Sequence, residues 1–238
     1  MYQFEAIGQV SSCYSEKFGV PRQPGLVSAA TARFTPHPPY NREEMVRGLE
    51  GYSHIWIVFV FHEAVSEGWR PMVRPPRLGG QKRVGLFASR SPHRPNPVGM
   101  SVVRLERVVV ESGTFYLDLS GVDLLDGTPV LDIKPYVSYS DSITRAEDGF
   151  AGEAMVEQKV VISPEVMAFC NDYRKSTGRD IEALIVQTLE SDPRPASQRT
   201  VGREYGVLLW DVNVRWRVEE WGFLVLSCGR NVGRGLRG

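Results

Sequence analysis

A run of prolines constrains the middle of this chain more than any other feature. Pro92, Pro95 and Pro97 lie within residues 84–105, a segment whose two ends are apolar in the manner of strands. Proline fixes φ and has no backbone donor, so the run between the ends cannot be a helix or a central strand. We therefore expect a stiff loop between two strands. It carries four polar side chains suited to ligand contacts: Arg90, His93, Arg94 and Asn96.

Stiffness favours a binding role for this loop, because groups that are already ordered lose less entropy when a ligand arrives. The alternative is a proline-rich connection with solvated arginines, since most loops only connect. A second polar position is His62-Glu63, at the end of an apolar run. A histidine at such a position is more often a rim residue than a catalyst.

Short strand patterns recur along the first 140 residues with little helix between them. Together they favour an antiparallel barrel or sandwich. The run 53–61 is the strongest and is expected to be covered on both faces. In the first run, Phe4, Ala6 or Ile7 is expected to face inward. Asn41 with Glu44 resembles a capping box for a short helix. Asp126-Gly127 indicates either a hairpin or a plain turn. The strand patterns are residues 4–10, 28–34, 53–61, 84–87, 102–105, 108–110, 114–119 and 130–133.

The composition changes after residue 143. An acidic, glycine-containing segment over 144–158 is typical of a linker between a domain of residues 1–143 and a small α+β domain of residues 159–238. Ser163-Pro164 predicts a helix start and Gly178 its end. Apolar residues at helical spacing over 181–189 predict a second helix, and strands are expected over 205–210, 212–218 and 223–228.

Charge is distributed unevenly along a chain whose formal net charge is zero. Residues 68–105 carry many basic side chains and no acid. Such a segment predicts an anionic partner, with RNA the large candidate, or else a solvated face that pairs with acids elsewhere. Arginine suits planar contacts with phosphate. The side chains concerned are Arg70, Arg74, Arg77, Lys82, Arg83, Arg90, Arg94 and Arg104.

Several chemistries find no support in the sequence. It has no phosphate-binding glycine loop, dinucleotide fingerprint or nucleophile elbow. Cys13, Cys170 and Cys228 are far apart in sequence and are expected to be free thiols, with no metal site. No apolar run is long enough to span a bilayer and the start lacks a signal-peptide pattern, so a cytoplasmic location is expected.

Four long motifs, in order, carry a resemblance to a known family. They are residues 18–26, 51–62, 91–101 and 123–136, with weaker likeness over 192–196 and 212–217. These segments resemble the TsaA-like family and cover nearly the whole chain. Ser197 departs from the family, which often has an aromatic residue at that position.

The resemblance implies a β-barrel methyltransferase, unrelated to the Rossmann type, that uses S-adenosylmethionine and acts as a homodimer. It implies methylation on N6 of the hypermodified threonylcarbamoyladenosine beside the anticodon of tRNA. By motif match, the cofactor would lie against Pro21, Arg22, Gln23, His62, Glu63, Arg90, Met100, Asp126, Gly127, Thr128 and Pro129. The anticodon arm would lie against Arg70, Arg74, Arg77, Lys82, Arg83 and Arg94.

Roles within that set stay open at the level of sequence. Asp126 or Glu63 could hold the amino group of the cofactor, and Arg22 or Arg90 its carboxylate. No indispensable general base is expected, with Asp126 the best candidate if one exists. Two other functions remain: a cofactor-binding barrel that regulates without transferring a methyl group, and an RNA-binding module without a cofactor.

Overall fold

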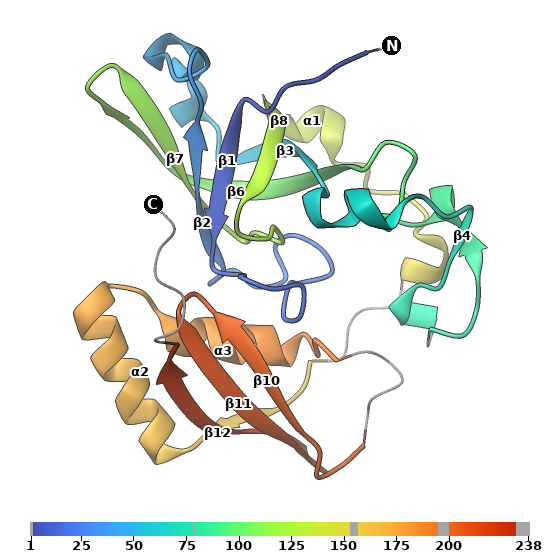
Figure 1. The fold of residues 1–238 in the computed structure, drawn as a ribbon, viewed down its shortest axis with the longest axis vertical. Coiled ribbons are helices and arrows are strands. Elements are labelled where there is room, and N and C mark those ends of the chain that lie inside the picture. Colours follow the sequence, from blue (N-terminus) through green and yellow to red (C-terminus); the bar gives the residue numbers. More distant parts are fainter. Residues whose placement is uncertain (1, 79, 153–156, 195–199, 232–238) are drawn as a thin grey trace.

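Six antiparallel strands close into a barrel in the first part of the chain (Figure 1). The structure is a computed structural model that describes residues 2–78, 80–152, 157–194 and 200–231. Around the barrel the order is β1-β2-β7-β6-β3-β8, and β8 closes it by pairing with β1. The mainly-β barrel is therefore confirmed and a sandwich is excluded. The strands are β1 (Gly8–Ser12), β2 (Thr31–Pro36), β3 (His54–Val60), β6 (Val98–Glu111), β7 (Thr114–Ser120) and β8 (Thr128–Pro135).

Strand β3 is the hydrophobic centre of the barrel. Ile55 and Ile57 are fully buried and Phe59 nearly so, while the alternate residues are half-buried. The outer face is covered only in part: the indole of Trp56 donates to Asp141 in the short helix α1 (Ser138–Asp141) at 3.0 Å. The predicted strand is confirmed, with one face more deeply buried than the other.

The direction of the strands decides where the connections lie. β1, β3 and β7 run the same way, because each is separated from the next by one antiparallel neighbour. Their carboxyl ends therefore meet at one end of the barrel. Three long connections leave from this end, which we call the loop end: residues 13–30, 61–97 and 121–127.

The connection 121–127 crosses the loop end from one side of the barrel to the other. β7 and β8 are not neighbours, so the hairpin predicted at Asp126-Gly127 is wrong. The turn itself is present, with the Thr128 amide donating to the Leu125 carbonyl at 3.2 Å and Gly127 at φ +80°. Val122 and Leu124 are buried, so this segment seals the barrel.

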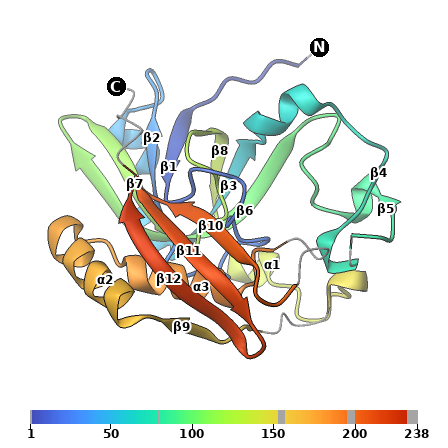
Figure 2. The same ribbon diagram turned by 60° about the horizontal axis from the view of Figure 1, so that its bottom comes forward.

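The connection 61–97 forms a lobe beside the barrel (Figures 1 and 2). β4 and β5 pair with each other and belong to no larger sheet. The strand expected at 84–87 covers only β5, because Ser89 donates its amide and hydroxyl to the Leu86 carbonyl and closes a 3₁₀ turn. The elements are η3 (His62–Glu67), β4 (Met72–Val73), η4 (Pro76–Leu78), β5 (Val84–Gly85) and η5 (Leu86–Ala88).

Two other local predictions are wrong. The first strand begins at Gly8, and Phe4 is 77% exposed because it precedes the first ladder bonds of the barrel, whereas Ile7 packs against the core. No capped helix starts at Asn41: two 3₁₀ turns, η1 (Glu43–Val46) and η2 (Leu49–Gly51), stand there without a side-chain cap. Gly48 at φ +85° separates them.

The second half contains the two helices and three strands that the sequence predicts, and a fourth strand, which pairs parallel with the last of them, makes the sheet mixed. The Ser163 hydroxyl accepts from the Val166 amide at 3.4 Å, and Gly178 ends the helix at φ +73°. Trp216 is fully buried between the rings of Tyr205 and Phe223. The elements are β9 (Val160–Ile162), α2 (Pro164–Thr177), α3 (Ile181–Glu190), β10 (Glu204–Leu209), β11 (Val212–Glu219) and β12 (Gly222–Arg230), with sheet order β10-β11-β12-β9 and an η6 turn (Gly149–Ala151) before them.

This second part packs against the loop end of the barrel (Figure 1). The amide of Trp210 donates to the Cys13 carbonyl at 2.7 Å, and Gln187 in α3 accepts from the Ala29 amide at 2.9 Å. Connection 13–30 is therefore held by both parts. The three cysteines are free thiols. Ser197 and residues 153–156 of the expected linker lie outside the described residues. None of the helices in the described part has the length and apolar character needed to cross a membrane.

The contact between Gly99 and Phe59 predicts a selective loss of stability. These residues pair across β6 and β3, and a methyl group on Gly99 would collide with the Phe59 ring. We expect Gly99→Ala to lower the free energy of unfolding by about 1–3 kcal/mol, measured by urea denaturation. Gly85→Ala is the matched control, because its methyl group would meet open space. Equal effects of the two substitutions would contradict this packing, as would failure of Phe59→Leu to relieve the Gly99→Ala defect.

Candidate active site

The loop end gathers side chains from all three long connections. Arg90 of the proline-rich run donates to the side-chain oxygen of Gln23, in connection 13–30. Ser101 at the start of β6 donates its hydroxyl to Asp123, in the crossing segment. Lys17 forms ion pairs with η3. Segments that the sequence singled out separately are thus brought together by strand direction.

Asp123 is the most perturbed acid of this site. It lies between the buried residues Val122 and Leu124, and burial raises the pKa of its carboxyl to about 6. The Ser101 hydrogen bond, its own backbone and the Arg90 charge oppose that rise. A carboxyl so placed changes charge near neutral pH beside a guanidinium. Asp123 is the first residue of the motif 123–136, but the sequence alone predicts no role for it.

A second polar cluster joins η3 to the proline-rich run. Lys17 Nζ lies 3.0 Å from Glu67 Oε1 and 3.8 Å from Glu63 Oε2. The Lys17 hydrogen bond is the main cause that lowers the pKa of Glu67. His93 Nε2 lies 3.8 Å from Glu67 Oε2. Glu63 is therefore paired with a lysine, and His62 beside it is half-buried.

Asp126 supports the backbone. Its carboxylate accepts from the Ser12 amide at 3.0 Å, and its own amide donates to the Tyr14 carbonyl at 2.8 Å. Gly127 and the buried Thr128 continue this attachment, with the Gly127 amide donating to the Val10 carbonyl at 2.9 Å. Asp126 is exposed and Pro129 half-buried. The hydrogen bonds of Asp126 therefore fit a structural turn residue, which is one of the two interpretations that the sequence allowed.

Arg22 points toward the second half of the chain. Its guanidinium donates to the backbone carbonyls of Asp192 and Arg194, at 3.4 and 3.2 Å. Asp192 and Arg194 form a buried ion pair with N–O distances of 2.7 and 2.9 Å. Pro21 beside Arg22 is buried, whereas Met100 at the start of β6 is 58% exposed.

The basic side chains predicted to meet RNA lie on the lobe. Arg70, Arg74, Lys82 and Arg83 are exposed. Arg94 is half-buried and donates to the Ser89 carbonyl at 2.9 Å, so part of its guanidinium fixes its own loop. Arg77 lies in η4, and its side chain is outside the described part.

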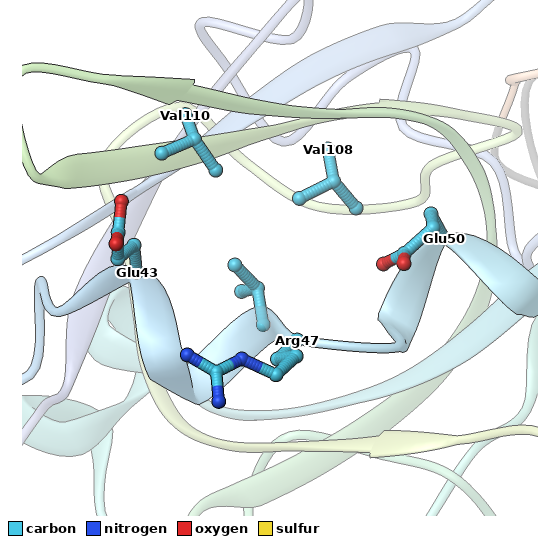
Figure 3. A pocket seen from close by; sticks show the side chains of 6 residues that line it. Glu43, Arg47, Glu50, Val108 and Val110 are labelled. Carbon is cyan, nitrogen blue, oxygen red and sulfur yellow. The ribbon is translucent and has the colours of Figure 1, made fainter.

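A shallow pocket of about 320 Å³ lies elsewhere, against the opposite end of the barrel (Figure 3). Figure 3 shows Val108 and Val110 of β6 across from Glu43, Arg47 and Glu50. None of the residues predicted to bind the cofactor lines it. The loop end is the better candidate site because it holds the buried and paired polar groups. Within the described ranges, no three His, Cys, Asp or Glu side chains gather closely enough to hold a metal ion.

Fold and site together define a barrel protein with a cluster of polar side chains at one barrel end and an α+β part packed beside it. The chain belongs to the tRNA-methyltransferase O family: the model of the N-terminal domain of that family matches residues 9–142, and the model of its C-terminal domain matches residues 156–231.

Named relatives agree over nearly the full length. The chain is 46% identical over 233 residues to the tRNA (adenine(37)-N6)-methyltransferase of Escherichia coli, covering 95% of this chain and 97% of that one. It is 46% identical over 211 residues to a Pseudomonas aeruginosa protein whose name describes an S-adenosylmethionine-dependent methyltransferase, covering 88% and 90%. The crystal structure of TrmO from Pseudomonas aeruginosa superposes with a TM-score of 0.82 at 39% identity, covering 96% and 98%.

The raised pKa of half-buried Asp123 predicts a pH-dependent stability. Its carboxyl is protonated in both folded and unfolded chains below its usual pKa of 3.8, so its contribution is complete there. As pH rises through about 6, the folded chain must ionise a partly desolvated carboxyl and the contribution is lost. We expect Asp123→Asn, which stays neutral, to gain stability relative to the parent chain between about pH 4 and 7, by up to about 3 kcal/mol.

Urea denaturation of both proteins across that range measures the difference. Carbon NMR of the side-chain carboxyl gives the midpoint directly. A stability difference that does not vary with pH, together with a midpoint in the ordinary aspartate range, would contradict the burial of Asp123.

Proposed function

We propose that this chain transfers a methyl group from S-adenosylmethionine to N6 of threonylcarbamoyladenosine beside the anticodon of tRNA. Membership of the tRNA-methyltransferase O family and the names of full-length relatives support the reaction class and the cofactor. The observation that carries the proposal is the contact of Arg90 with Gln23 at the loop end, together with the half-buried Asp123, whose carboxyl interacts with the Arg90 charge. This constellation joins all three connections that the motifs span.

The chemistry of the loop end fits this cofactor. A guanidinium (Arg90) suits a carboxylate, a half-buried carboxyl (Asp123) suits an ammonium group, and an exposed thioether (Met100) offers an apolar surface. When bound, S-adenosylmethionine supplies an electrophilic methyl group on a sulfonium. The proposed binding set is the one that the motifs imply, with Asp123 added as a neighbour of Arg90.

The work of the chain is mainly positioning. Stiff loops that hold the two reactants in line could supply ~7–11 kcal/mol of the barrier. The methylated nitrogen loses its proton readily, so an essential general base is not required. Asp126 is then a weak candidate for such a base, since its carboxylate already accepts from the Ser12 amide.

Further parts of the proposal concern organisation. We propose a barrel domain of residues 1–143, a linker of residues 144–158 and a small domain of residues 159–238. The matched ranges 9–142 and 156–231 support this division. A cytoplasmic homodimer is proposed by resemblance to the family. The exposed basic side chains of the lobe would hold phosphates of the anticodon arm.

The first experiment measures methyl transfer from labelled S-adenosylmethionine to two tRNA pools, with and without the threonylcarbamoyl group. We expect label only in the modified pool. Arg90→Ala removes a charge-assisted contact worth about 1.5–3 kcal/mol, so transfer should fall roughly ten- to hundredfold. Arg47→Ala, an arginine of the other pocket, is the matched control and should transfer normally.

Each failure has its own meaning. Cofactor binding without label in either pool would contradict the methyltransferase and favour a regulatory binding protein. RNA binding without any cofactor effect on thermal unfolding would favour an RNA-binding module. Equal losses in Arg90→Ala and Arg47→Ala would move the site away from the loop end.

A further inference from the structure

The side chain of Phe87 is strongly exposed for an aromatic residue. It is 83% exposed at the middle of η5, and Trp69 on the same lobe is 61% exposed. Large aromatic side chains left in water forgo the stabilisation that burial gives. Exposed aromatics that are clustered and set among charges mark interaction sites.

The turn under Phe87 is firmly anchored. Leu86 before it is buried, and its amide donates to the Pro71 carbonyl at 3.0 Å. Ser89 after it donates its amide and hydroxyl to the Leu86 carbonyl, at 3.0 and 2.8 Å. The Phe87 ring is therefore presented on a fixed backbone, so little conformational entropy remains to be lost when a partner binds.

A guanidinium accompanies the ring. Arg94 lies with its central carbon 5.8 Å from the centre of the Phe87 ring. Its Nη1 donates to the Ser89 carbonyl at 2.9 Å, which fixes the guanidinium on the same turn. Arg94 thus lies over the Phe87 ring, which stays largely open to solvent, and we call these two residues the stacking pair.

The lobe that carries the stacking pair is rich in basic side chains. Residues 68–105 contain no acid, and Arg70, Arg74, Lys82 and Arg83 are exposed on the same lobe. Phe87 also stands three residues before Arg90, which contacts Gln23 of the proposed cofactor site. Aromatic faces combined with arginines and a positive field match single-stranded nucleic acid, whose bases stack while its phosphates meet cations.

We propose that the stacking pair holds an unpaired base of the RNA substrate beside the methyl-transfer site. This inference rests on the proposed function. It assigns Phe87 the role of binding RNA by stacking, which needs no charge on the side chain. A stacking residue and a phosphate contact differ in one measurable respect. Loss of a phosphate contact reduces the dependence of affinity on salt, whereas loss of a stacked ring leaves that dependence unchanged.

The test measures binding of the full chain to a 17-nucleotide anticodon stem-loop RNA at several salt concentrations. We expect Phe87→Ala to weaken binding by about five- to hundredfold, with an unchanged salt slope. Phe87→Trp should retain affinity, because indole also stacks. Arg83→Ala should weaken binding and lower the salt slope by about one. S-adenosylmethionine binding, measured by calorimetry, should be the same in the parent chain and in Phe87→Ala.

Phe4→Ala is the matched control, since Phe4 is a comparably exposed phenylalanine outside the basic segment. Three outcomes would overturn the proposed stacking role. In the first, Phe87→Ala binds RNA as well as Phe4→Ala does. In the second, Phe87→Ala lowers the salt slope as Arg83→Ala does, and in the third Phe87→Ala alters the sedimentation coefficient. The last result would make the ring part of a contact between copies of the chain. A parent chain that methylates tRNA normally while Phe87→Ala has no effect would leave the proposed function intact. A parent chain that binds no RNA would overturn both.

Discussion

Closure of the barrel by β8, which pairs with β1 on one side and β3 on the other, decides where every polar loop lies. Closure fixes strand direction, and direction brings the carboxyl ends of β1, β3 and β7 to one end. Closure also separates β7 from β8, so the chain must cross that end to connect them. The crossing segment buries Val122 and Leu124 and holds Asp123 half-buried between them, where desolvation raises the pKa of its carboxyl. The strand topology therefore determines which loops meet at the candidate site, whichever side chains those loops carry.

Two aspartates three residues apart show how this topology sets chemistry. Asp123 faces the sealed barrel end, accepts from the Ser101 hydroxyl and has its pKa raised to about 6 by burial. Asp126 is exposed at the turn that follows, where its carboxylate accepts from the Ser12 amide. The first is a titratable group next to Arg90, and the second holds the turn against β1. Residue type alone cannot separate these roles, because depth in the structure makes the difference.

The sequence predicted what local signals encode. β3 followed from an unbroken β-branched and aromatic run, and α2 from Ser163-Pro164 and Gly178, because propensity and caps act within a few residues. The prediction for Phe4 is wrong because strand pairing begins after it. The helix predicted at Asn41 is wrong because Gly48 at φ +85° divides that segment into two short turns. Asp126-Gly127 misled because a turn signal does not say which strands it joins. The proline-rich run and its motifs located the site loops, but the burial of Asp123 depends on a crossing that only the closed barrel reveals.

The second half of the chain acts on the site through connection 13–30. Arg22 donates to the carbonyls of Asp192 and Arg194, and these two residues form a buried ion pair under the ring of Phe223. A buried pair adds little net stability, because desolvation offsets most of its attraction. Its charged hydrogen bonds instead demand one geometry, since leaving either partner unpaired would be costly. The carbonyls that receive Arg22 are therefore held in place, and so is the start of the Pro21–Gln23 segment that Arg90 meets from the other side. The α+β part therefore holds connection 13–30, one of the three connections that form the loop end, in a fixed position.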